Sequence, residues 1–106
     1  MTQRDSLPEA LLSDVENYLD VTWRDEATDM KYRGLIASGM AYLDRKLGEK
    51  GDYLSDGAPR TLLMEYVRYG RDSALDVFEN NYQSMILAMQ NDRKVSAYVE
   101  STAAAE

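Results

Sequence analysis

The chain has 106 residues, 44% of them hydrophobic and 29% charged, a composition typical of one globular domain with its own core. It contains neither cysteine nor histidine, so disulfides and thiolate metal sites are excluded, and the commonest general base and transition-metal ligand are missing. We therefore expect no zinc site and no enzyme built on a Ser-His or Cys-His pair.

The net charge of −7 is unevenly distributed along the chain. Residues 1–30 carry eight acidic and two basic side chains, residues 31–60 carry four acidic and six basic ones, and the remainder is acidic again. Because affinity for nucleic acid comes mainly from Lys and Arg, so acidic a chain is a poor free-standing DNA binder. The asymmetry indicates either a solvated surface that favours solubility, or complementarity between unlike ends of neighbouring subunits.

No segment has the composition of a membrane or export signal. The longest apolar runs fall far short of the roughly 18–20 residues of a membrane span. The N-terminal MTQRDSLPEA lacks the basic and apolar parts of a signal peptide. We expect a protein without membrane contact, kept in the cytoplasm or in a particle assembled there.

The first predicted helix runs from about Ser6 to Asp20. Ser6 and Glu9 have the spacing of a capping box, and Pro8 is tolerated in a first helical turn. An apolar stripe at helical spacing follows, made by Leu11, Leu12, Val15, Tyr18 and Leu19. The next four residues, Val21–Arg24, are interpreted as a connector.

The segment DEATDMKYRGLIASGMAYLDRKLG, Asp25–Gly48, predicts one long helix with two faces. Thr22 or Asp25 caps its start, and Gly48 is a natural left-handed stop. The large stripe, expected to face the subunit's own core, consists of Ile36, Met40, Leu43 and Leu47. The small stripe, expected to allow a close helix contact within the bundle or across a subunit seam, consists of Gly34, Ser38 and Ala41. Neither face offers acid–base or nucleophilic chemistry.

A loop and a third helix come next. The loop is GEKGDYLSDGA, residues 48–58, and Tyr53 and Leu54 are expected to pin it to the body. The helix, PRTLLMEYVRYGR, begins at Pro59, and Gly70 weakens or ends it. Its expected buried side is Leu62, Leu63, Tyr66, Val67 and Tyr69.

A fourth helix is predicted to start near Asp76, where Asp76–Glu79 resembles a capping box, and to end at Asn91–Asp92. Its expected apolar side is Phe78, Tyr82, Met85, Ile86 and Met89. This divides the chain into a helical domain, 1–91, and a C-terminal tail, 92–106, that is either frayed or ordered by a partner. The predicted fold class is all-α: a small bundle of about four helices, a long second helix, and an extended or partly helical tail.

Two groups of residues invite a chemical interpretation. Asp25, Glu26 and Asp29 could hold magnesium, but acids at a helix N-terminus are favourable for structural reasons, and we interpret them as capping. The segment Gly34–Gly39, GLIASG, lacks the Lys-Ser/Thr of a phosphate loop and lies inside a helix, so close packing is preferred.

Other residues are candidates for protein contact. Arg60, Arg68 and Arg71 could form a basic stripe that is solvated, ion-paired, or turned to an acidic partner. Aromatic residues are favoured in interfaces, and some of the eight tyrosines lie in segments expected to be connectors, loops or tails. The candidate interface residues are Trp23, Arg24, Gly34, Ser38, Tyr53, Arg68, Arg71 and Tyr98.

Three blocks together resemble a known family. They are Leu11–Gly48, then GAPRTLLMEYVRYGRDSALDVFENNY at Gly57–Tyr82, then SMILAMQ at Ser84–Gln90. In order and spacing they are similar to the head–tail connector, or adaptor, proteins of tailed phages and of prophages in Gram-positive bacteria. The most distinctive parts are Tyr18-Leu19-Asp20 with Trp23 and Asp25-Glu26, and the helix that begins at Pro59-Arg60.

The resemblance implies a helical subunit in a homo-oligomeric ring, of about twelve copies in the virion, below the portal protein of the capsid. Such a ring extends the DNA channel and docks stopper or tail-completion proteins. Double-stranded DNA passes through it without specific binding, and the resemblance implies neither enzymatic activity nor a cofactor. The alternative is a small prophage-encoded regulator or DNA-binding module, whose best recognition helix would be Arg60–Arg71.

Overall fold

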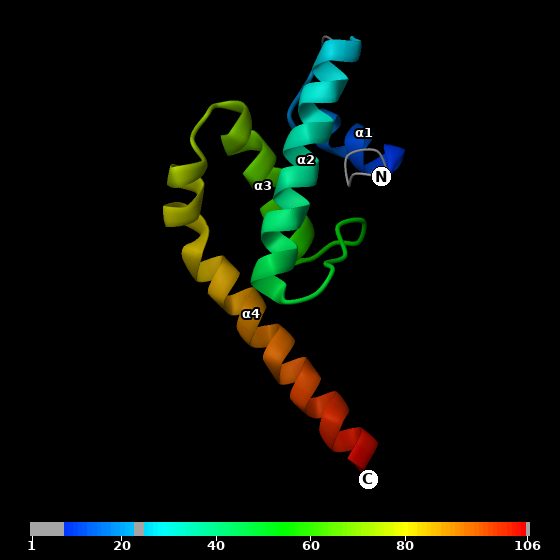
Figure 1. Ribbon diagram of the computed structural model, residues 1–106, viewed down its shortest axis with the longest axis vertical. Helices are drawn as coiled ribbons and strands as arrows, with labels where there is room; N and C mark the ends of the chain where they lie inside the picture. The colour runs from blue at the N-terminus through cyan, green and yellow to red at the C-terminus, as the bar shows by residue number, and fades with distance from the viewer. Residues whose placement is uncertain (1–7, 23–24, 106) are drawn as a thin grey trace.

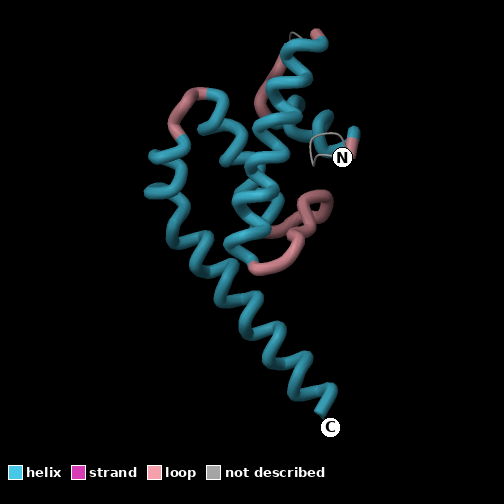
Figure 2. Tube along the Cα trace, viewed as in Figure 1, coloured by secondary structure: helices cyan, strands magenta, loops and turns pink. Residues whose placement is uncertain are grey.

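The computed structural model describes residues 8–22 and 25–105, with side chains to Ser101. Four helices account for most of this part of the chain: α1 (Glu9–Tyr18), α2 (Glu26–Leu47), α3 (Ala58–Arg71) and α4 (Leu75–Ala105) (Figure 1). The described residues contain no strand, so the all-α class is confirmed. Loops are confined to the short connections and to the segment between α2 and α3 (Figure 2). Ser6, of the expected capping box, lies outside the described residues.

The long second helix has the predicted boundaries because its ends carry good caps. The Asp25 carboxylate accepts a hydrogen bond of 2.7 Å from the Thr28 N–H, which satisfies one of the free amides of the first turn. Gly48 ends the helix with φ of 79°, in the left-handed region that glycine tolerates. Of the two proposed N-caps, Asp25 rather than Thr22 fills the role.

Helix α3 is the centre of the core. It packs against the other three helices, and its residues 62–67 are consecutively buried. On α2, Ile36 and Leu43 are fully buried, and Met40 and Leu47 pack at the edge of the core, as the large stripe predicted. Aromatic rings surround Phe78 and hold the first half of α4 against the body. They belong to Tyr42 on α2, to Tyr66 and Tyr69 on α3, and to Tyr82 on α4 itself.

The close approach of α2 and α3 occurs at Gly39, not at the predicted small stripe. A Cβ on Gly39 would lie 2.7 Å from Leu63 Cδ1 and 2.8 Å from Tyr66 Cδ1. Ser38 and Ala41 are exposed, and Gly34 is half-buried. A tight contact within the bundle is therefore excluded for Ser38 and Ala41. Helix α3 also continues through Gly70, whose lack of a side chain leaves room for Leu35.

Tyr53 is a core residue that anchors the loop. Its side chain is 4% exposed, and its hydroxyl donates to the Asp44 carboxylate at 2.5 Å. Burial and this hydrogen bond raise the pKa of Tyr53 well above its usual value. The prediction that Tyr53 pins the loop is confirmed, whereas Leu54 is exposed and the assignment of Tyr53 to an interface was wrong.

Helix α4 is one 31-residue helix, so the predicted end at Asn91–Asp92 was wrong. Asn and Asp each cost less than about 1 kcal/mol inside a helix, and no Gly or Pro follows Gly70 to stop it. Gln90 also donates to the Lys46 carbonyl at 2.9 Å, and Arg93 pairs with Glu49. Beyond that ion pair α4 leaves the body and projects to the C-terminus (Figure 1). We call residues 94–105 the arm.

Candidate protein-interaction surface

Metal ligands are not clustered in the part of the chain that the structure describes. No group of three or more His, Cys, Asp or Glu side chains in that part could hold a metal ion. The acids at the start of α2 include the capping carboxylate of Asp25, in agreement with the structural interpretation. No described helix is long and apolar enough to cross a lipid bilayer.

The three arginines of α3 do not form one stripe, because each is held by a different neighbour. Arg60 donates to the Asp14 carboxylate at 3.1 Å and to the Tyr53 carbonyl at 3.0 Å, which ties α1 and the loop to α3. Arg71 contacts the Leu19 carbonyl at 3.4 Å. These bonds turn Arg60 and Arg71 toward the protein rather than toward a partner.

Arg68 belongs to a network around the buried carboxylate of Glu65. The Glu65 side chain accepts hydrogen bonds from the Tyr18 hydroxyl at 2.5 Å and from Arg68 Nε at 2.8 Å. Burial alone would raise the pKa of Glu65, but these hydrogen bonds and the charge of Arg68 outweigh it and lower the pKa. The network joins α1 to α3, and Arg68 and Arg71 line a shallow polar hollow beside Tyr18.

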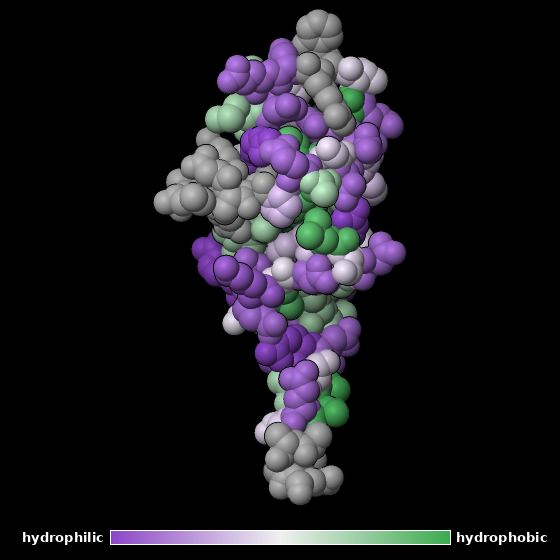
Figure 3. All heavy atoms as spheres, turned by 90° about the vertical axis from the view of Figure 1, so that its right-hand side faces the viewer, coloured by the Kyte–Doolittle hydropathy of each residue, from purple (hydrophilic) through white to green (hydrophobic). Residues whose placement is uncertain are grey.

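The arm carries three apolar side chains that are more than half exposed. Tyr98 is 72% exposed, Val99 58% and Val95 54%. Their spacing of three and four residues places them on one side of the helix. Apolar side chains are visible on the projecting part of the molecule in Figure 3. Exposed apolar residues clustered on a projecting helix are typical of a protein contact.

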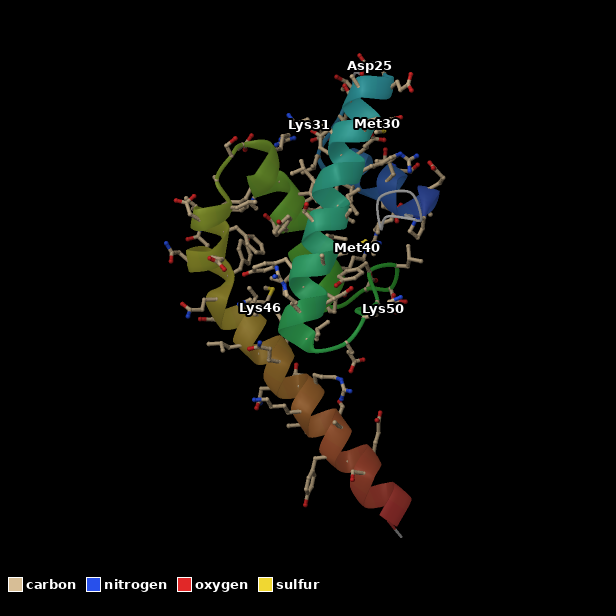
Figure 4. The ribbon with its side chains drawn as sticks, viewed as in Figure 1. Asp25, Met30, Lys31, Met40, Lys46 and Lys50 are labelled. Carbon is tan, nitrogen blue, oxygen red and sulfur yellow. The ribbon has the colours of Figure 1, made fainter. Side chains whose placement is uncertain are left out.

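A groove lies between α2 and α4, where the two helices converge. It encloses about 260 Å³, and its lining includes Tyr42, Lys46, Glu79, Gln83, Ile86 and Leu87. Lys46 extends from the lower part of α2 toward α4 (Figure 4).

Polar interactions of the side chains fix the walls of the groove. The Tyr42 hydroxyl donates a hydrogen bond to Glu79 at 2.9 Å. Burial, and to a smaller extent this hydrogen bond, raise the pKa of Tyr42 to about 12. Lys46 Nζ lies 5.4 Å from the centre of the Tyr42 ring, a cation–π contact. Leu87, on the rim, is 56% exposed. The groove therefore has fixed walls, and most of the side chains that line it are polar.

Of the predicted interface residues, the structure brings Arg68 and Arg71 together at one hollow and places the other described ones apart from it. Tyr98 and Ser38 are exposed on different elements, Arg68 is half-exposed, and Arg71 is partly covered. Trp23 and Arg24 lie outside the described residues. The sequence analysis did not predict the groove. One signal for it was Leu87, an apolar residue that lies outside the predicted buried side of the fourth helix, to which Ile86 and Met89 belong.

Comparison with known proteins identifies no relative of this chain. No protein-family model matches the chain, and neither a curated protein nor a solved structure does.

Proposed function

We propose that this protein is a head–tail connector subunit that forms a ring below a phage portal and docks stopper or tail-completion proteins. The observation that carries the proposal is the arm: a regular helix that leaves the body and exposes Tyr98, Val95 and Val99. Exposed apolar side chains on a projecting helix gain burial when another protein chain packs against them. Together with the sequence resemblance over Leu11–Gln90, it supports a function based on assembly.

The charge distribution is compatible with a DNA channel. DNA must pass through such a ring without being held, and acidic side chains repel its phosphates. We expect acidic residues to line the channel and the basic middle segment to face neighbours or the portal. Within that segment, Arg33 pairs with Glu9, while Lys31, Arg45 and Lys46 are exposed.

The described residues support the connector over a DNA-binding regulator. A recognition helix must present one free face with clustered Lys and Arg to a DNA groove. The candidate, α3, is instead the central helix, with residues 62–67 buried. Arg60 and Arg68 are held by Asp14 and Glu65.

Two binding measurements test the proposal. The protein is expected to co-purify with the portal protein encoded in the same phage or prophage genome. A chain that ends at Arg93 should lose this association, and Leu54→Ser, which changes an exposed apolar residue elsewhere, should retain it. Specific duplex binding at physiological salt, without portal association, would replace the connector with the regulator.

A further inference from the structure

We propose that the Asp56-Gly57 pair is a site of spontaneous covalent modification, at which the folded protein converts aspartate to isoaspartate. Both reacting groups belong to the chain itself, so the reaction needs no second molecule except water. The Gly57 backbone nitrogen is the nucleophile, and it attacks the side-chain carboxyl of Asp56. The reaction is independent of the proposed function.

The two steps of the reaction balance without an oxidant or a reductant. The Gly57 nitrogen forms a bond to Asp56 Cγ, and the amide proton leaves with the carboxyl hydroxyl as water. The product is a succinimide ring, in which the nitrogen joins Cγ to the main-chain carbonyl carbon of Asp56. Water then adds to either carbonyl. Cleavage at Cγ restores aspartate, whereas cleavage at the main-chain carbon leaves isoaspartate, with the backbone running through Cβ and Cγ.

The surroundings of Gly57 leave its nitrogen open to this reaction. Beyond its chain neighbours, a Cβ built on Gly57 would meet only one described atom within 4 Å, Pro59 Cδ at 3.8 Å. Among the described residues, the Gly57 N–H donates to no backbone carbonyl. Asp56 and Gly57 are both exposed, at the end of the loop that projects between α2 and α3 (Figure 2). Ring closure requires the backbone to rotate, and an exposed loop permits this more readily than a helix does.

Asp52, in the same loop, is protected by its hydrogen bonds. Its carboxylate accepts from the Leu54 N–H at 3.0 Å and from the Ser55 N–H at 3.2 Å. The bond from Leu54, and after it those from Ser55, lower the pKa of Asp52. A carboxyl that stays ionised is a poor target for a nucleophile, and the bulky side chain of Tyr53 shields the next nitrogen.

Asp72-Ser73 is the other described pair in which a small residue follows an aspartate. The Ser73 nitrogen already donates to the Gly70 carbonyl at 3.1 Å, in the turn that ends α3. The Asp72 carboxylate lies 3.6 Å from Arg71 Nε. Both reacting groups of this pair are therefore held by neighbours, and the open pair is Asp56-Gly57.

The folded protein can carry the product, because the change falls between two anchors of the loop. Isomerisation adds one carbon to the main chain and removes one from the side chain. The side chains of residues 54–56 are exposed, so the core does not depend on their path. Tyr53 is buried before this stretch, and after it the Gly57 carbonyl accepts the Thr61 N–H at 3.1 Å. Isoaspartate should therefore accumulate without unfolding the chain.

Ageing of the folded full chain in heavy-oxygen water tests the site, because the second step places a heavy oxygen atom in the product. Digestion with trypsin in ordinary water then releases GDYLSDGAPR, residues 51–60, which contains both Asp52 and Asp56. Fragmentation in a mass spectrometer locates the label and the isoaspartate. We expect several-fold more isoaspartate at Asp56 than at Asp52 or Asp72.

Two variants of the exposed Asp56 identify the ring as the intermediate. Asp56→Asn should react faster than the parent chain, since it closes the same ring with loss of ammonia. Asp56→Glu keeps the charge but would need a larger ring, and several-fold less labelled product is expected at that position. Equal isoaspartate at Asp52 and Asp56, or equal labelling of Asp56→Glu and the parent chain, would overturn the proposal.

The free peptide GDYLSDGAPR, aged in parallel, gives the rate for a chain without tertiary structure. In the folded protein the rate at Asp56 should lie within an order of magnitude of the peptide's rate. A larger reduction would show that the loop is held closed to the reaction and would overturn the proposal. The urea midpoint should not change as isoaspartate accumulates, and a fall would overturn the claim that the fold carries the product. None of these outcomes depends on portal binding, so the modification and the connector function fail separately.

Discussion

The same substitution at two neighbouring positions of α2 is expected to have opposite effects on the stability of the fold. Gly39 faces Leu63 and Tyr66 at a close contact between α2 and α3, whereas Ser38 is exposed. Gly39→Leu is expected to destabilise the fold strongly, and Ser38→Leu is expected to leave it intact. The pair changes adjacent residues of one helix to the same side chain, so each variant controls for the other.

The magnitude follows from the contacts. A Cβ alone on Gly39 would come within 2.8 Å of two side chains that are themselves buried, and a leucine adds three more carbons. Overpacking typically costs about 1–3 kcal/mol, and we expect at least the upper end, about 3 kcal/mol. The better helix propensity of leucine returns less than about 1 kcal/mol. An exposed substitution such as Ser38→Leu stays within about 0.5 kcal/mol.

Urea unfolding followed by circular dichroism measures the difference. With a denaturant slope of about 1–3 kcal/mol per molar urea, the midpoint of Gly39→Leu should fall by roughly 1 M or more. Ser38→Leu should unfold at the midpoint of the parent chain. If the two variants unfolded together, the contact between α2 and α3 at Gly39 would be wrong.

Three further predictions concern the core, the buried carboxylate and the arm. Phe78→Ala, in the centre of the ring cluster, should lower the free energy of unfolding by about 3–5 kcal/mol, while Leu87→Ala on the exposed rim should cost far less; equal losses would contradict the placement of Phe78. Glu65→Gln should cost about 1–3 kcal/mol at pH 7. The pKa of Glu65 is lower in the folded state than in the unfolded state, so the Glu65 carboxylate stabilises the fold above the unfolded pKa of about 4, and this stabilisation is lost as the pH falls through the folded-state pKa. The difference in stability between the parent chain and Glu65→Gln should therefore vanish in acid. A difference that did not depend on pH would refute this role of Glu65. A chain that ends at Arg93 should lose helical signal but keep the urea midpoint, and a large fall in the midpoint would show that the arm packs on the body.

The helices that the sequence predicted well have strong local signals. Asp25 and Gly48 mark the two ends of α2 by capping chemistry that depends on single residues. Ile36 and Leu43 follow the helical period and are buried as expected. Such features need no knowledge of the neighbouring helices.

The errors have a common physical cause, because each depended on tertiary contacts. The choice between Gly39 and the stripe of Gly34, Ser38 and Ala41 depends on where α3 crosses α2. Tyr53 lies in a loop by composition, yet a hydrogen bond to Asp44 and burial make it a core residue.

The continuation of α4 past Asn91–Asp92 is the third such case. Two weak helix formers indicate a stop only when nothing supports the helix around them. Here the bond from Gln90 to Lys46 and the ion pair of Arg93 support it on both sides. The arm, on which the proposed function depends, is the element that the local pattern concealed.

Electron microscopy of the protein mixed with its portal tests the central claim most directly. A connector predicts a ring of this chain seated on the portal around an open axial channel, with acidic side chains lining the channel. A portal that remains bare, or a ring in which Lys31, Arg33, Arg45 and Lys46 all face the lumen, would contradict the account.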